Sequence, residues 1–171
     1  MASSQPRARR AAVRLGTGGR GDATVSTGLP VLDHLLGLVA RHAALDVALE
    51  VAPGGGVEGV LEAARSLGER LAEVLPAGAL GAAVVPSDEA LAQVVLEASG
   101  RPLVVSNVDL SPEHVGGLGT DVVSRFLGEL AQGAGLTLHV RLVEGRETQH
   151  VLDAIFKGLG AALGEACRPR T

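Results

Sequence analysis

The hydrophobic positions of the chain follow two periodicities. Apolar residues recur at helical spacing in four segments: 31–41, 57–74, 121–132 and 149–166. Apolar and polar residues alternate, as in half-buried strands, in 45–51 and 136–143, and shorter β-like runs occur at 11–15, 23–27, 91–97 and 103–108. Glycine- and proline-rich stretches separate these segments. The pattern predicts an α+β protein with two ββαβα units.

The two units resemble each other in sequence. Segment 31–51 aligns with 122–142 at an offset of 91 residues, and segment 57–74 aligns with 149–166 at an offset of 92. The matched positions include Leu36 with Leu127, Gly37 with Gly128, Leu67 with Leu159 and Gly68 with Gly160. The same apolar and glycine spacing over two consecutive elements indicates an internal duplication. We therefore expect two sheets, each with helices packed on one face.

The repeat sets the expected domain boundaries. Repeat 1 covers about 10–76 and repeat 2 about 88–166, so 10–166 forms one domain. Residues 1–9 are expected to be a flexible N-terminus, and 167–171 a C-terminal tail.

Composition narrows the function classes. Of 171 residues 46% are hydrophobic but only 1% aromatic, so we expect a core of Leu, Val, Ala and Ile with Phe126 and Phe156 as its only large rings. The net charge of −4 and the absence of Trp and Tyr argue against a nucleic-acid partner. No apolar run reaches the roughly 18 residues of a membrane span. The single Cys167 and the lack of a signal-like segment favour a cytoplasmic protein.

One helix face carries residues suited to chemistry. His150, Asp153 and Lys157 fall on one stripe of the helix expected at 149–166. A His and a carboxylate three residues apart can bind one metal ion, and a Lys one turn further on could meet a phosphate. The alternative is a solvated polar face with an Asp153–Lys157 pair at i,i+4.

The other histidines are ambiguous from sequence. His34 and His42 lie eight residues apart on the first helix, hence about 80° apart around it, and form no local pair. His139 lies in an expected strand. Each could contact a ligand, but a lone histidine of this kind is more often a hydrogen-bonded structural residue.

Two further sites carry charge in turn-like positions. Asp88 and Glu89 follow Pro86 and open a helix- or strand-like run, where carboxylates often act as caps. Arg101 lies in the turn SGRP and could bind an anion or be solvated. The chain contains no nucleophile elbow, P-loop or dinucleotide fingerprint.

Three sequence blocks resemble one enzyme family. STGLPVLDHLLGLVARH (26–42), SDEALAQVVLEASGRP (87–102) and GLTLHVRLVEGRETQHVLDAIFKGLGAAL (135–163) resemble, in order and separation, the signatures of the imidazoleglycerol-phosphate dehydratases. The third block resembles the family's Thr-Leu-His strand and His-His-x-x-Glu-Ala-x-Phe-Lys helix. The resemblance covers residues 10–166 and implies a duplicated fold similar to domain 2 of ribosomal protein S5.

The resemblance also implies a function. The family dehydrates imidazoleglycerol phosphate to imidazoleacetol phosphate in histidine biosynthesis. It uses two manganese ions, bound by His and Glu from both halves and from neighbouring subunits of a 24-subunit shell. A metal-bound imidazolate can accept electron density when a carbon proton and the hydroxyl leave.

The implied metal ligands are incomplete in this chain. In the first half the His-His-x-x-Glu motif should fall at 57–61, but no histidine occurs between His42 and His114. In the second half Gln149 replaces the first His and Asp153 replaces the Glu. Another ligand His aligns with Arg125, which brings positive charge to a cation site. The remaining candidate ligands are His34, His150 and Asp153, with Glu58 as a further candidate. Manganese binding is expected to be weak or partial.

The implied phosphate contacts are better preserved. Arg101 and Lys157 match residues that contact the substrate phosphate in the family, and His42 matches a residue near the substrate. A third arginine aligns with Ala79, and the Glu of an N-terminal Glu-Thr motif aligns with Ala8. Phosphate binding is therefore expected in a weakened form.

Three functions remain open from sequence. The first is a structural or regulatory paralogue with little or no dehydratase activity, forming a symmetric homo-oligomer or co-assembling with an authentic dehydratase. The second is an active manganese-dependent dehydratase whose atypical site uses His34, His150, Asp153 and Glu58 across subunits. The third is another binder of phosphate ligands that uses Arg101, Lys157 and His150.

Overall fold

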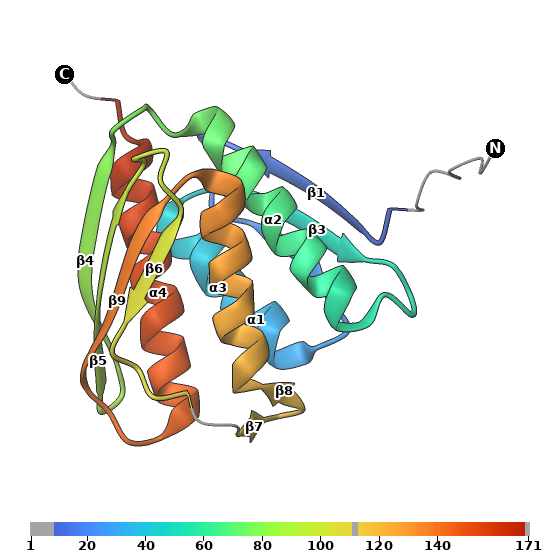
Figure 1. The fold of residues 1–171 in the computed structure, drawn as a ribbon, viewed down its shortest axis with the longest axis vertical. Helices are drawn as coiled ribbons and strands as arrows, with labels where there is room; N and C mark the ends of the chain where they lie inside the picture. The colour runs from blue at the N-terminus through green and yellow to red at the C-terminus, as the bar shows by residue number, and fades with distance from the viewer. Residues whose placement is uncertain (1–8, 111–112, 170–171) are drawn as a thin grey trace.

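The computed structural model describes residues 9–110 and 113–169 and shows a layer of helices between two sheets (Figure 1). The predictions for residues 1–8 and for 170–171 lie outside the described residues. The helices are α1 (Pro30–Ala43), α2 (Gly56–Val74), α3 (Thr120–Ala134) and α4 (Thr148–Cys167). The strands are β1 (Ala11–Gly16), β2 (Ala23–Ser26), β3 (Asp46–Val51), β4 (Leu80–Ser87), β5 (Ala90–Glu97), β6 (Leu103–Ser106), β7 (His114–Val115), β8 (Leu118–Gly119) and β9 (Thr137–Glu144).

The two sheets share one pairing pattern, as a duplication requires. In the first sheet, of order β1-β3-β2, the central β3 is antiparallel to β1 and parallel to β2. In the second, of order β4-β5-β9-β6, β9 is antiparallel to β5 and parallel to β6. Thus β1, β2 and β3 correspond to β5, β6 and β9. Among the described residues, β4 at a sheet edge and the short β7–β8 hairpin have no counterpart in the first half. The predicted α+β fold of two ββαβα halves is confirmed.

The helices of the two halves pack on each other crosswise. Helix α2 packs on α3, and α4 packs on α1, so each half's second helix covers the other half's first (Figure 1). A Cβ atom on Gly68 would lie 2.4 Å from the Leu130 carbonyl oxygen, and one on Gly160 would lie 2.6 Å from that of Val39. Gly68 and Gly160 are equivalent in the repeat, as are Val39 and Leu130. The two contacts are therefore copies of one contact, and both require glycine.

Small and branched side chains fill the space between the sheets, as the composition predicts. Phe126 and Phe156 are both fully buried, and the rest of the buried hydrophobic set is Leu, Val, Ala and Ile. In β5 the burial alternates strictly, with Ala92, Val94 and Leu96 facing the helices. This one-sided burial places the polar and charged side chains on helix ends, turns and outer sheet faces.

The structure corrects the prediction for the segment around Pro86. Asp88 and Glu89 do not open an element; they form the two-residue turn of the β4–β5 hairpin, with Ser87 paired to Ala90 and Asp88 at φ 51°. Strand β4 was not predicted because Pro86 lies inside it. Proline is tolerated there because β4 is an edge strand. Among the described residues, no helix is both long and apolar enough to cross a membrane.

Candidate functional site

The first half presents His34 from the start of α1. Pro30 begins the helix, where a missing N–H costs nothing. The Asp33 carboxylate accepts hydrogen bonds from the Thr27 amide (2.9 Å) and hydroxyl (2.5 Å), which fixes the entry of the chain into the helix. One residue later, His34 projects toward α4. Its Nε2 atom lies 3.1 Å from Oδ1 of Asp153.

Asp153 is the more enclosed partner of this pair. Its side chain is 17% exposed, against 55% for His34. The same Oδ1 accepts a second hydrogen bond from Nε2 of Gln149, at 2.9 Å. The structure thus brings together two predicted metal ligands and holds the shortened carboxylate by a residue one turn earlier on α4.

His150 meets a different set of groups. Its Nδ1 lies 2.5 Å from Oε2 of Glu89 and 3.5 Å from the Glu147 carboxylate, and its Nε2 lies 3.3 Å from Oδ2 of Asp88. The two predicted candidates Asp88 and Glu89 therefore converge on His150 from the β4–β5 turn.

The electrostatics of this cluster favour a charged imidazole. The backbone N–H of Glu147 and other backbone donors, together with the hydrogen bond from His150, lower the pKa of Glu89 to about 2. The hydrogen bond to Glu89 in turn raises the pKa of His150, with the Glu147 and Asp88 charges adding to the effect. Both ring nitrogens face carboxylates, so the imidazolium form is stabilised and a metal ion would have to displace a proton.

The three side chains predicted to share one face of α4 contact different parts of the structure. His150 turns to the β4–β5 turn and Asp153 to α1, while Nζ of Lys157 donates to the Pro86 carbonyl oxygen at 3.3 Å. The alternative of an Asp153–Lys157 ion pair is not what the structure shows, because Asp153 is occupied by His34 and Gln149.

The three predicted phosphate contacts do not form one cluster within the chain. His42 packs beside Gly160, and its pKa is lowered by burial first and then by the charges of Lys157 and Arg41. Arg101 lies instead in the turn before β6, where its carbonyl oxygen accepts from the Thr137 hydroxyl.

Sheet order separates the two cations. Lys157 contacts β4 and Arg101 precedes β6, and these strands are opposite edges of the four-stranded sheet. Three strand spacings of about 4.8 Å amount to about 14 Å. One phosphate group cannot bridge them, so any joint phosphate site needs a second chain.

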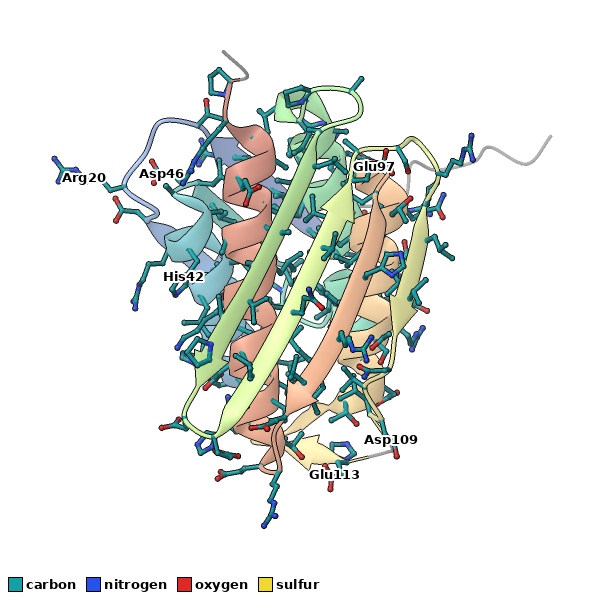
Figure 2. All side chains as sticks on the ribbon, turned by 90° about the vertical axis from the view of Figure 1, so that its left-hand side faces the viewer. Arg20, His42, Asp46, Glu97, Asp109 and Glu113 are labelled. Atoms are coloured by element: carbon teal, nitrogen blue, oxygen red, sulfur yellow. The ribbon has the colours of Figure 1, made fainter. Side chains whose placement is uncertain are left out.

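His139 lies apart from the other candidates. It is exposed on β9, on the sheet face turned away from the helices, in a shallow hollow with Gln93, Val105 and Asn107. Figure 2 looks onto this face. His139 therefore shares no site with His34 or His150.

The positions that the repeat relates to His150, Asp153 and His34 carry no histidine. Glu58, which corresponds to His150, is exposed and forms an ion pair with Arg10. Leu61 corresponds to Asp153, and the exposed Arg125 on α3 corresponds to His34. The first half thus offers one carboxylate, already paired with a cation.

The donor set can be compared with the two manganese ions that the sequence resemblance implies. In the described part of the chain, no three His, Cys, Asp or Glu side chains are grouped so as to hold one ion. His34 and Asp153 supply two donors, and His150 is engaged by Asp88 and Glu89. Manganese prefers six hard ligands, so two donors leave most positions to water or to another subunit.

Two contributors to the site went unpredicted. Glu147 lies three residues before His150, a helical spacing that could have indicated their contact. Gln149 was considered only as a lost ligand, yet it supports Asp153.

Comparison of the sequence with known proteins finds matches to one enzyme family. The sequence profile of imidazoleglycerol-phosphate dehydratase matches residues 27–163. The dehydratase of Clostridium botulinum (strain Kyoto / Type A2) is 38% identical over 155 residues, covering 86% of this chain and 79% of the relative. That of Desulforudis audaxviator is 37% identical over 163 residues, covering 91% and 83%.

Solved structures agree with the sequence match. The crystal structure of imidazoleglycerol-phosphate dehydratase from Staphylococcus aureus superposes with a TM-score of 0.84 at 30% identity, covering 95% of this chain and 96% of that one. The Pyrococcus furiosus enzyme in complex with (S)-C348 gives 0.79 at 27% identity, covering 94% and 89%. The duplicated fold, the matched profile and these relatives together show that the chain belongs to the imidazoleglycerol-phosphate dehydratase family.

Proposed function

We propose that this protein keeps the family fold but has little or no dehydratase activity, and acts as a structural or regulatory member of the histidine-biosynthetic machinery. The observation that carries the proposal is the first-half counterpart of His150: Glu58, which is exposed and paired with Arg10. A two-metal site built from both halves would need imidazole ligands from the first half, and the position equivalent to His150 supplies a carboxylate instead.

The second half supports the same proposal. A metal ion could be held by His34 and Asp153, and when bound it would supply Lewis-acid stabilisation of an anionic ring. His150 would stabilise negative charge as an imidazolium rather than donate a lone pair, because Glu89 and Asp88 flank its two nitrogens. Gln149 orients Asp153. None of these residues replaces the missing first-half donors.

We further propose a symmetric homo-oligomer, alone or co-assembled with an authentic dehydratase. Arg101 and Lys157 are separated within one chain, and only a neighbouring subunit could bring such cations to one phosphate. Arg125 would then stabilise an anion at a subunit boundary, since a guanidinium stays charged and cannot bind a metal ion at neutral pH.

An active dehydratase with an atypical site is the second candidate. It is favoured by identities of 37–38% to proteins named as dehydratases. Such a site would need His34, Asp153, His150 and Glu58 from different subunits to share manganese.

A turnover assay separates the two candidates. Protein purified from a host lacking its own dehydratase is supplied with manganese and imidazoleglycerol phosphate. We expect turnover several orders of magnitude below ordinary enzyme rates of about 10 per second. Ordinary turnover that is lost on His150→Ala and retained in the outer-face control His139→Ala would reject the proposal and support the second candidate.

A further inference from the structure

The glycine-rich loop between β1 and β2, residues 17–22, has a counterpart of equal length in the second half. Strands β1, β3 and β2 pair as β5, β9 and β6 do, and β3 is related to β9 by the repeat offset of 91 residues. The registers of these pairings give an offset of 81 residues both before and after the loop, so 17–22 corresponds to 98–103 without insertion. Arg20 therefore occupies the position of Arg101.

The backbone of the loop is held on both sides of Arg20. Oδ1 of Asp46, the first residue of β3, accepts hydrogen bonds from the amide of Gly21 at 3.1 Å and from that of the next residue at 2.9 Å. A Cβ atom on Gly19 would collide with the same carboxylate, and one on Gly21 would lie 2.9 Å from the Ala40 carbonyl oxygen of α1. Both positions require glycine, and Arg20 projects from a fixed backbone.

The donor groups of the two loops differ in their partners. In the second half the Gly100 amide donates to a carbonyl oxygen just after α3 at 2.9 Å, and the Arg101 amide donates to the Ser99 hydroxyl at 3.0 Å. The equivalent amides of Gly19 and Arg20 have no acceptor among the described residues. The Arg20 guanidinium also forms no ion pair there. The first-half loop thus has three donor groups without a partner in the described chain.

Further positive charge lies beside this loop. A Cβ atom on Gly21 would lie 2.9 Å from Cα of Arg41, so the loop packs directly on the last turn of α1. Burial first and then neighbouring cations, Arg41 among them, lower the pKa of His42. Figure 2 shows Arg20 extending away from Asp46, on the side of the molecule that carries His42. The Asp46 carboxylate is turned into the loop toward its two amide donors, so it does not neutralise Arg20.

We propose that the guanidinium of Arg20 and the amides of Gly19 and Arg20 bind the phosphate group of a small molecule. Guanidinium and backbone N–H groups form charge-assisted hydrogen bonds to phosphate oxygens, and the planar fork of arginine contacts two oxygens at once. A phosphate group offers three oxygens to these three donor groups, whereas a carboxylate offers two. The fixed backbone lowers the entropy cost of ordering the site.

This site is separate from the one predicted at Arg101. Arg20 precedes β2 of the three-stranded sheet, while Arg101 precedes β6 of the four-stranded sheet. The inference uses the strand registers and the hydrogen bonds of the loop, and it does not depend on the proposed loss of dehydratase activity.

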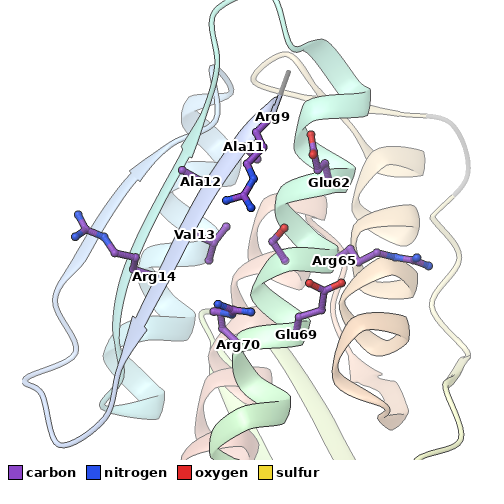
Figure 3. A pocket seen from close by; sticks show the side chains of 10 residues that line it. Arg9, Ala11, Ala12, Val13, Arg14, Glu62, Arg65, Glu69 and Arg70 are labelled. Carbon is purple, nitrogen blue, oxygen red and sulfur yellow. The ribbon is translucent and has the colours of Figure 1, made fainter. Parts of the chain in front are cut away.

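Phosphate titration followed by NMR tests the site in the variant Arg101→Ala, which removes the second-half candidate. Inorganic phosphate should shift the amide signals of residues 19 and 20, with an affinity that Arg20→Ala lowers by about tenfold or more. Arg20→Lys keeps the charge without the planar fork and should also weaken binding. The matched control is Arg14→Ala. Arg14 is exposed on β1, forms no ion pair among the described residues and points away from α2 (Figure 3), so its removal should leave the affinity unchanged.

A second titration with glycerol phosphate identifies the source of the phosphate group. An ester that binds no more tightly than inorganic phosphate supports free phosphate as the ligand, and a tighter ester supports a phosphorylated metabolite. Chloride at the same ionic strength should leave the signals in place. The proposal is overturned if phosphate shifts the two amides no more than chloride does. It is equally overturned if Arg20→Ala or Arg20→Lys binds phosphate as well as the parent variant.

Discussion

His34 and Asp153 are 119 residues apart in the chain, yet their side chains meet at 3.1 Å where α1 crosses α4. The contact joins the first helix of one half to the second helix of the other. It is the pair of donors that we propose for a metal ion in this protein.

Manganese should therefore bind with a stoichiometry well below two per chain. Titration calorimetry on the purified protein measures this directly. His34→Ala and Asp153→Ala should each remove most of the residual binding, because each deletes one of two donors. Gln149→Ala should weaken it less, since Gln149 only orients the carboxylate. Two tight sites per chain would contradict the divided donor set.

Phosphate affinity should depend on Arg101. Removal of one charge-assisted contact costs about 1.5–3 kcal/mol, so Arg101→Ala should weaken binding of inorganic phosphate by about 10- to 100-fold. Arg146, exposed on another loop, supplies the control Arg146→Ala. Equal affinities of the two variants, measured by competition calorimetry, would show that Arg101 is simply solvated.

The cluster around His150 should make the free energy of unfolding fall both at low pH, where Glu89 is protonated, and at higher pH, where His150 loses its proton. Glu89 has a lowered pKa, so its contribution is present above its ordinary value of 4.5 and is lost as the pH falls toward about 2. His150 has a raised pKa, so its contribution is present below its ordinary value of 6.5 and is lost as the pH rises through the raised value.

Thermal unfolding measured over a range of pH can detect both losses of stability. The difference in Tm between the native protein and Glu89→Gln should be largest between pH 4.5 and 6.5 and should shrink on either side. The control Glu50→Gln changes an exposed carboxylate on the other sheet. A difference that is constant over pH would mean that the Glu89–His150 contact does not contribute to folding.

The crosswise helix contacts should tolerate no added methyl group. Gly68→Ala and Gly160→Ala place a Cβ against backbone atoms that cannot move away, and overpacking of this kind costs about 1–3 kcal/mol or more. Gly128→Ala provides a matched control, because this exposed glycine of α3 has no atom within 4 Å of the added Cβ. There the substitution should stabilise the protein by about 0.5–1 kcal/mol. Denaturant unfolding measures all three.

Sequence periodicity was sufficient to predict the helices and central strands of the repeat, because each of them has one buried face. It did not predict β4, because Gly81 and Pro86 interrupt the strand pattern of this segment and its place depends on packing against α4. Most members of the site were predictable from the sequence, except Glu147 and the supporting role of Gln149, but the contacts between them were not. His150 and Glu89 are 61 residues apart, and only the β4–β5 turn brings the carboxylate to the helix.

The crosswise packing also bears on ancestry. An unduplicated half could make the same α2–α3 contact with a second copy of itself about a two-fold axis, so the present chain has the geometry of a fused dimer. Fusion keeps the copies together at high effective concentration without demanding that they stay identical. In a fused chain each copy can change independently. Arg125 occupies the position equivalent to His34, and Glu58 the position equivalent to His150, and a dimer of two identical chains could not carry such differences.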